Sequence, residues 1–235
     1  MDTSVSELKK RAAVTAADMV EDGMIVGLGH GSTALFAVQR IAERIKAGEL
    51  RDITGVPCSL EMGDAAQALG IPLTTLDDHP DIDLTIDGAD EVDPHLNVIK
   101  GGGGALLREK IVAQVTNREI IVVDESKLSP VLGTQWAVPV EVIPFGQRTH
   151  QRFLESLGAQ VTLRTTTDGS VFQTDQGNVI LDANFGPIGS PEELGAELDC
   201  RTGIVAHGLF LGLAERVIVA GAKGDTVMTL AEQEA

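Results

Sequence analysis

The stretch Met24-Ile-Val-Gly-Leu-Gly-His-Gly-Ser-Thr33 indicates the fold more clearly than any other part of the sequence. Its first six residues are an apolar run that predicts a short buried strand, and the glycines around His30 predict a tight turn. An amphipathic pattern over residues 32–47 then predicts a helix that ends at Gly48. A strand that leads into a helix through a glycine-rich turn is typical of a parallel α/β sheet.

The same alternation extends to both sides of this stretch. Before it, Ser4-x-x-Glu7 has the form of a capping box and opens an amphipathic helix. After it, helical patterns at 60–69 and 105–115 lie among apolar runs that predict strands, namely 53–56, 73–76, 82–86 and 120–123. Strands that alternate with helices predict βαβ units in a Rossmann-like parallel sheet.

The pattern changes after Ser129-Pro130. Here strands and helices follow in the order β-α-β-β-α, which is typical of a ferredoxin-like unit; the expected elements are 138–143, 147–157, 160–164, 178–182 and a helix from Ser190-Pro191. A last apolar run at 217–220 can return to the first sheet. We therefore expect an α/β protein with a Rossmann-like parallel-sheet domain, residues 1–131 plus 207–235, and a smaller ferredoxin-like α+β domain, residues 132–206.

Composition argues against several classes of partner. The chain has 18 Lys plus Arg against 35 Asp plus Glu, a formal charge of −17, and only six Phe, one Trp and no Tyr. Phosphate backbones repel such a chain and bases find few rings to stack on, so we expect no nucleic acid partner. No apolar run approaches the roughly 18 residues of a membrane helix, and the polar N-terminus lacks a signal core. We expect no membrane partner and a cytoplasmic location.

Cysteine and histidine usage argues against a metal site. Cys58 and Cys200 are far apart and form no C-x-x-C pattern, which predicts reduced thiols rather than a disulfide framework. The five His are scattered, without H-E-x-x-H or a Cys/His cluster. We expect no metal and no cofactor.

The glycine turn after the first strand has the composition of an anion site. Backbone N–H groups at a helix N-terminus, with hydroxyls from Ser32 and Thr33, favour a phosphate. The Gly-Lys-Ser/Thr of a nucleotide triphosphate loop is absent, and G-x-G-x-x-G fails because residue 32 is Ser. The alternative is a plain strand–helix turn that Ser32 caps.

An acidic segment, Asp81 to Asp93, includes the expected strand at 82–86. Asp87 and Asp90 fall at the carboxyl end of that strand, where open α/β sheets bind ligands. A calcium loop beginning at Asp83 is disfavoured, because its third and twelfth positions would hold Thr and Pro. A solvated acidic turn is the alternative, and it is the better account for Asp81, Glu91 and Asp93.

Four consecutive glycines, Gly101 to Gly104, lie between Lys100 and a helix that carries Glu109. Each glycine costs conformational entropy, so such a run indicates backbone that approaches a ligand closely. A flexible linker is the alternative, but linkers seldom interrupt a βαβ unit. A further Lys, Lys127 in Asp124-Glu-Ser-Lys127, ends another expected strand and is uninformative by itself.

These candidates share one chemistry. Carboxylates, lysines and backbone donors without a cofactor suit proton transfer next to a carbonyl. One carboxylate takes the carbon-bound proton, a second acid exchanges the oxygen-bound proton, and a cation with N–H donors stabilises the enediolate.

Together, G-x-G-H-G-S-T, D-G-A-D-E-V-D, K-G-G-G-G-A-L-L-R-E and D-x-S-K resemble the ribose-5-phosphate isomerase A family, in this order and over essentially the whole chain. The resemblance implies interconversion of ribose 5-phosphate and ribulose 5-phosphate through a cis-enediol(ate), in the non-oxidative pentose phosphate pathway and without a metal. It also implies a homodimer or homotetramer.

The resemblance implies roles as well. Glu109 looks like the general base, Asp87 and Asp90 like acids for ring opening and oxygen protonation, and Lys100 like the enediolate stabiliser. The residues that would bind the substrate are His30, Gly31, Ser32, Thr33, Gly88, Ala89, Gly101, Gly102, Gly103, Lys127 and Lys9. His30 stands where the family commonly has Thr or Ser, and we expect a modest effect if the contact is mainly through backbone.

Two other classes of function stay open on the residues alone. One is a different enzyme on a related sheet, an amino-sugar-phosphate deaminase or a coenzyme A transferase, which would release ammonia or form an acyl-glutamate. The other is a non-catalytic sugar-phosphate sensor, which would need a DNA-binding extension.

Overall fold

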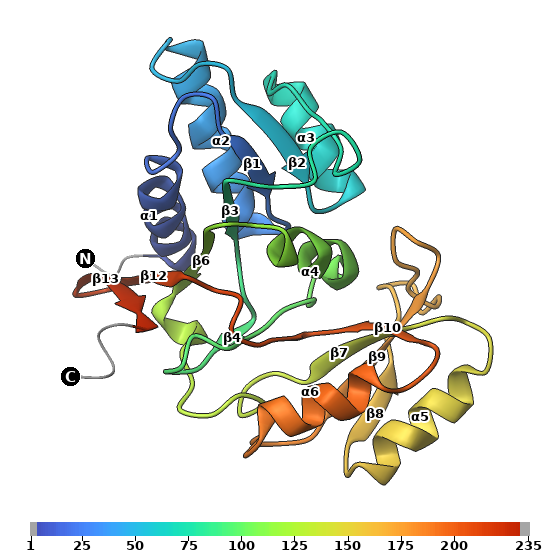
Figure 1. Cartoon of the computed structure of the whole chain (residues 1–235). Helices are drawn as coiled ribbons and strands as arrows, with labels where there is room; N and C mark the ends of the chain where they lie inside the picture. The colour runs from blue at the N-terminus through green and yellow to red at the C-terminus, as the bar shows by residue number, and fades with distance from the viewer. Residues whose placement is uncertain (1–3, 231–235) are drawn as a thin grey trace. The chain divides into compact units, whose positions relative to one another are not determined.

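A six-stranded sheet forms around the glycine-rich stretch in the computed structural model, which describes residues 4–230 (Figure 1). Its strand order is β13-β12-β6-β3-β1-β2, and every neighbouring pair is parallel except β12 with β13. The strands are β1 (Ile25–Leu28), β2 (Thr54–Pro57), β3 (Leu84–Asp87), β6 (Glu119–Asp124), β12 (Arg216–Gly221) and β13 (Gly224–Thr229). The predicted Rossmann-like sheet is confirmed, and the run at 217–220 returns to it as β12.

Three helices cover this sheet through small, apolar faces. Helices α1 (Val5–Ala17) and α2 (Ser32–Lys46) pack together on one face, where buried alanines of both helices allow close approach. Ser4 caps α1 by accepting a hydrogen bond from Glu7 N, as the capping pattern predicts. Helix α3 (Leu60–Leu69) begins at Ser59, whose side chain accepts from Met62 N.

A second sheet has the ferredoxin-like arrangement. Its antiparallel order is β10-β7-β9-β8, from a β-α-β-β-α-β chain order. The elements are β7 (Val138–Val142), α5 (Gln147–Ser156), β8 (Gln160–Leu163), β9 (Val179–Asn184), α6 (Pro191–Asp199) and β10 (Ile204–His207). Leu154 of α5 and Leu198 of α6 are both fully buried in the core of this sheet. The ferredoxin-like prediction is confirmed, although β10 was not predicted.

The remaining strands form a small three-stranded sheet. It has the order β11-β5-β4 and consists of β4 (Glu91–Val92), β5 (Val98–Ile99) and β11 (Leu209–Phe210). Helix α4 (Leu106–Gln114) follows β5, and a short 3-10 helix, η1 (Glu125–Lys127), follows β6. Strands of two residues carry too little periodicity to be predicted from sequence.

The chain divides into two compact units. The first runs to Ala89 and includes Ile111–Lys127 and the chain from Gly212, and the second is Asp90–Lys110 with Leu128–Leu211. Residues 90–110 fall in the second unit, where β4 and β5 pair with β11, and residues 128–131 and 207–211 fall there as well. Residues 1–3 and 231–235 of the predicted larger domain lie outside the described residues.

One expected strand is wrong. Residues 73–76 form no strand, and Leu73 makes only an isolated bridge to Gly55. Within residues 4–230, no helix is long and apolar enough to span a membrane.

Candidate active site

The first unit places two of the candidate motifs at a reversal of strand order. Strand β1 is flanked by β2 on one side and by β3 on the other, so the chain changes direction across the sheet at β1 and β3. Open α/β sheets bind ligands at such a switch point, beyond the carboxyl ends of the strands. The turn at Gly29–Gly31 follows β1, and Asp87 is the last residue of β3.

Asp87 ties the two strand ends together. Its buried carboxylate accepts hydrogen bonds through Oδ1 from His30 N at 3.0 Å and from Gly88 N at 2.7 Å. A side chain at Gly29 would overlap the Asp87 carboxylate, which explains the glycine there. The Asp87 carboxylate, at the end of β3, therefore fixes the conformation of the turn that follows β1.

The start of α2 carries exposed donors. Gly31 is the N-cap, with φ +93° and no side-chain cap, and Ser32 and Thr33 form the first turn. Lys9 Nζ, from α1, donates to Ser32 Oγ at 3.4 Å. A helix N-terminus with a hydroxyl and an ammonium beside it is suited to an anion.

The remaining candidates of this unit lie nearby or at the same sheet edge. The His30 ring contacts Ser59, with Nδ1 2.9 Å from Ser59 Oγ. The contact of His30 with Asp87 is made by its backbone N–H. Gly88 lies beside Thr33, since a Cβ on Gly88 would be 3.8 Å from Thr33 Cβ. Lys127 ends η1, directly after β6, and is half-buried.

The second unit holds Asp90 and the glycine run in direct contact. Gly102 N donates to Asp90 Oδ2 at 2.7 Å, while Asp90 N donates to Ile99 O at 2.8 Å. A Cβ on Gly102 would be 2.6 Å from Asp90 Oδ1, so a larger residue would displace the loop or the Asp90 carboxylate. The run is an ordered loop and not a flexible linker.

Lys100 and Glu109 form a buried ion pair across this loop. Lys100 Nζ lies 3.1 Å from Glu109 Oε1, and the two side chains are 2% and 4% exposed. Burying two charges is costly unless they are paired, so the pairing fixes both positions. The site thus places a carboxylate, an ammonium and glycine N–H groups within one short segment.

Phe210 and a second lysine, Lys110, extend this cluster. The Phe210 ring lies 5.7 Å from Lys100 Nζ and 5.0 Å from Lys110 Nζ, within the range of cation–π attraction. Lys110 Nζ also donates to Leu209 O at 2.9 Å and lies 3.4 Å from His207 Nδ1. Burial lowers the pKa of Lys110 to about 8, although Asp199 opposes that shift.

His207 links this lysine to α6. Its Nε2 is 3.1 Å from Asp199 Oδ1, and Leu209 N donates to Nδ1. Burial, with a smaller effect of Lys110, lowers the pKa of His207 to about 4, so the ring is neutral near pH 7. Nε2 then donates to Asp199, which leaves Nδ1 as the acceptor for Lys110 and Leu209 N.

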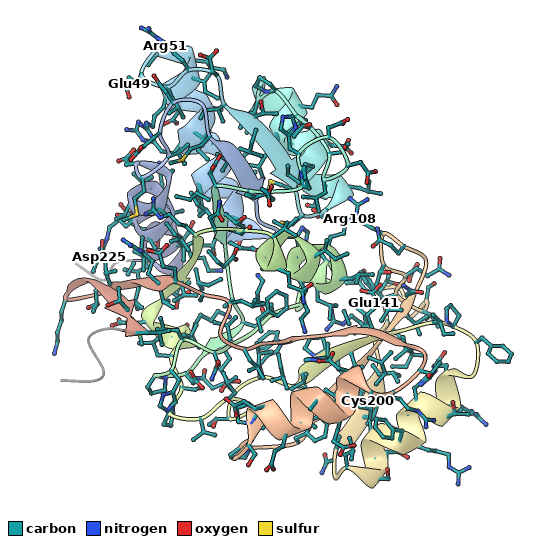
Figure 2. The ribbon with its side chains drawn as sticks, viewed as in Figure 1. Glu49, Arg51, Arg108, Glu141, Cys200 and Asp225 are labelled. Atoms are coloured by element: carbon teal, nitrogen blue, oxygen red, sulfur yellow. The ribbon has the colours of Figure 1, made fainter. Side chains whose placement is uncertain are left out.

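The sequence did not indicate Arg164, which reaches the glycine run. Arg164 follows β8, and its Nη1 donates to Gly101 O at 2.7 Å and to Gly102 O at 3.1 Å. No local pattern marks this arginine, because its partners lie about 60 residues earlier in the chain. By contrast Arg108, next to Glu109 on α4 and labelled in Figure 2, turns to Asp175 at 3.9 Å.

The predicted site residues therefore fall into two sets, one in each unit. The turn, Asp87, Gly88, Ala89, Lys9 and Lys127 belong to the first unit, and Asp90, Lys100, Gly101, Gly102, Gly103 and Glu109 belong to the second. Among residues 4–230, no group of three or more His, Cys, Asp or Glu side chains has the arrangement of a metal site.

Comparison with known proteins is consistent with this chemistry. Residues 54–224 match the family described as ribose 5-phosphate isomerase A (phosphoriboisomerase A). A ribose-5-phosphate isomerase A of Desulfatibacillum aliphaticivorans is 57% identical over 222 residues, which cover 94% of this chain and 96% of that protein. One of Chloroflexus aurantiacus is 56% identical over 225 residues, which cover 95% and 94%.

Solved structures agree over nearly the whole chain. A D-ribose-5-phosphate isomerase in complex with phospho-erythronic acid has a TM-score of 0.94 at 39% identity, covering 96% of this chain and 99% of that one. The ribose 5-phosphate isomerase of Plasmodium falciparum has a TM-score of 0.92 at 39% identity, covering 95% and 98%.

Proposed function

The chain belongs to the ribose-5-phosphate isomerase A family, and from this membership and its site we propose that it interconverts ribose 5-phosphate and ribulose 5-phosphate. The observation that carries the mechanism is the buried pair of Lys100 and Glu109, 3.1 Å apart, beside an ordered run of glycine N–H groups. A relative with a TM-score of 0.94 binds phospho-erythronic acid, a four-carbon acid phosphate, which supports a sugar phosphate as the substrate.

Glu109 acts as the general base of the isomerisation. It removes the proton from C2 of the open-chain aldose, and the electron pair moves through C1 to the carbonyl oxygen, giving a 1,2-enediolate. Glu109 then returns the proton to C1, while the C2 hydroxyl loses its proton and becomes the ketone. One proton moves between carbons and one between oxygens, so the reaction needs no redox partner.

Lys100 and the N–H groups of the glycine run stabilise the enediolate oxygen. The cation is buried, and a buried charge acts on a developing oxyanion with little screening by water. Asp90, which Gly102 N already contacts, and Asp87 exchange the oxygen-bound protons and assist ring opening.

The first turn of α2 binds the phosphate. Backbone N–H groups from Gly31 to Thr33, the Ser32 hydroxyl and the ammonium groups of Lys9 and Lys127 provide the donors. His30 contributes its backbone N–H to this turn. Gly88 and Ala89, which lie between Asp87 and Asp90 in the sequence, contact the sugar.

The reaction proceeds without a metal, and direct assay with excess chelator tests this. We expect ketose to appear from ribose 5-phosphate at an unchanged rate when chelator is present. Loss of turnover in chelator would show that a metal is required, and absence of turnover despite sugar-phosphate binding would support the sensor alternative.

Replacement of Glu109 distinguishes its role as the general base from the roles of the other acidic residues. Glu109→Gln should retain the Michaelis constant within a few-fold while turnover falls by orders of magnitude, because a base acts only in the transition state. Glu193→Gln, an exposed carboxylate on α6, is the matched control and should behave as the wild type. Turnover near the wild-type rate in Glu109→Gln would refute the assignment.

We also propose that the enzyme is a homodimer or homotetramer in the cytoplasm. The smaller unit exposes large apolar side chains, including Trp136 and Phe145, which a subunit interface would bury. A sugar phosphate carries charge that a lipid bilayer excludes, so its enzyme is expected in the compartment that makes it. Light scattering of the purified protein tests the first point; a monomer at micromolar concentration would contradict it.

A further inference from the structure

Arg164 connects the antiparallel sheet of the smaller unit to the glycine run. Its side chain is 14% exposed, and its guanidinium uses one edge for Asp182 of β9, through Nε at 2.9 Å to Oδ2 and through Nη2 to Oδ1. The Nη1 group bonds the carbonyls of Gly101 and Gly102 at 2.7 Å and 3.1 Å. The bidentate pairing with Asp182 holds the planar fork in one orientation.

The position of these two carbonyls fixes the direction of two N–H groups. In a trans peptide the C=O and the following N–H point in opposite directions. The carbonyls of Gly101 and Gly102 belong to the peptides that carry Gly102 N–H and Gly103 N–H. Both carbonyls point to Arg164, so both N–H groups point away from it, and Gly102 N–H indeed meets Asp90 Oδ2 on the other side at 2.7 Å.

Besides Arg164, the glycine run is held by the bond from Gly102 N to Asp90 and by a turn in which Gly104 N donates to Gly101 O at 3.0 Å. Glycine has the largest backbone freedom of any residue, so a run of four would sample many orientations of its peptides. A cation that binds two successive carbonyls removes that freedom, and it polarises the same peptides toward stronger N–H donation.

We infer that Arg164 is a positioning residue for the isomerisation, which holds the N–H group of Gly102 on Asp90 and aims the N–H group of Gly103 at an enediolate oxygen. This inference rests on the proposed function. Arg164 touches no reacting atom in this role, because it acts through the peptides whose carbonyls it binds. Asp182 assists Arg164 in this role, because it fixes the orientation of the guanidinium and neutralises its charge.

Kinetics of Arg164→Ala tests the inference. We expect turnover to fall by about 10- to 100-fold, with the Michaelis constant unchanged within about threefold, because the donors remain but lose their alignment with the transition state. Millimolar methylguanidinium, which can occupy the vacated site between Asp182 and the carbonyls, should restore part of the turnover. Asp182→Asn, which loosens the same fork, should lower turnover less.

A purely structural arginine would behave differently. Arg201→Ala is the control, because Arg201 stacks on Phe153 at 4.9 Å in the same unit without contacting the glycine run. Wild-type turnover in Arg164→Ala would overturn the inference, as would a loss that follows the fraction of unfolded protein and is not rescued by methylguanidinium. If Arg164→Ala does not fold, Arg164→Lys is compared with the wild type in the same way. Lysine keeps the positive charge but lacks the planar guanidinium that binds both carbonyls.

The controls also separate this inference from the proposed function. Glu109→Gln is measured beside the Arg164 variants. If Glu109→Gln loses turnover while Arg164→Ala keeps it, the isomerisation mechanism stands and only the role of Arg164 fails. If the wild type has no isomerase activity, the proposed function fails first.

Discussion

Gly102 and Asp90 show how closely backbone and carboxylate approach in this site. The N–H of Gly102 lies 2.7 Å from Asp90 Oδ2, and a methyl group at residue 102 would be 2.6 Å from Asp90 Oδ1. A contact that short forces the loop or the carboxylate to move. A methyl group at residue 102 therefore disturbs the hydrogen bond between the loop and Asp90.

Gly102→Ala should lower turnover by about 10- to 100-fold, because the displaced loop no longer aligns its donors with the enediolate. Gly189→Ala is the matched control, since that position has open space around it and no positive φ. Steady-state kinetics of both variants, with thermal unfolding to confirm the fold, checks the prediction. Equal turnover in the two variants would contradict it.

Single residues also show what the sequence could and could not predict. Lys100, Glu109 and the glycine run were predicted because they stand together in one segment. Arg164 and Phe210 were not, because Phe210 reaches that segment through the pairing of β11 with β5 and Arg164 reaches it through its side chain from a distant part of the chain. Local patterns carry no information about such contacts.

At the scale of elements, the start of α2 is the part that the proposed function uses for binding. Its first turn presents Ser32 and Thr33 after an N-cap glycine without a side-chain cap, and Lys9 from α1 lies beside it. These groups contact a phosphate that does not change during the reaction. They should therefore contribute equally to ground-state and transition-state binding.

Ser32→Ala should raise the Michaelis constant about 3- to 10-fold and leave turnover nearly unchanged, because a lost neutral hydrogen bond weakens uniform binding. Ser6→Ala, an exposed residue of α1, serves as the control. Initial rates over a range of ribose 5-phosphate concentrations give both constants. An unchanged Michaelis constant would mean that the phosphate binds elsewhere.

Elements differ in how well sequence predicts them. Strands β1, β3, β6 and β12 were predicted because each is a buried apolar run beside a parallel neighbour. The two-residue strands β4, β5 and β11 were missed, and the apolar run at 73–76 formed only a bridge. Short strands depend on their partners more than on their own residues.

The molecule as a whole should lose stability in mild acid through His207. Folding lowers the pKa of His207 from 6.5 to about 4, mainly by burial. Between these values the native protein binds fewer protons than the unfolded chain, so the free energy of unfolding falls as pH decreases. The pKa of buried His150 is also lowered, which adds in the same direction.

Urea unfolding between pH 7 and pH 4 measures this effect. His207→Gln should remove part of the loss, at most about 3 kcal/mol at pH 4, because glutamine does not titrate in this range. Exposed His79 provides the control His79→Gln. Lys110 does not interfere, because with a folded pKa of about 8 it stays largely protonated in both states between pH 7 and pH 4, and its effect on the free energy of unfolding is then nearly constant. Parallel pH curves for wild type and His207→Gln would refute the prediction.

The division into units was the least predictable feature of the whole molecule. The two sheet types and their order along the chain follow from local patterns, but residues 90–110 join the smaller unit through pairing with β11. Candidate residues at 87 and 90, three positions apart in sequence, thus belong to different units.

Isomerisation in deuterium oxide, followed by NMR, measures whether Glu109 moves a proton between C2 and C1. We expect wild-type enzyme to introduce deuterium only at C2 of ribose 5-phosphate and at C1 of ribulose 5-phosphate, and Glu109→Gln to lose both exchange and turnover. Turnover at the wild-type rate in Glu109→Gln would overturn this assignment. So would exchange at the wild-type rate in Glu109→Gln.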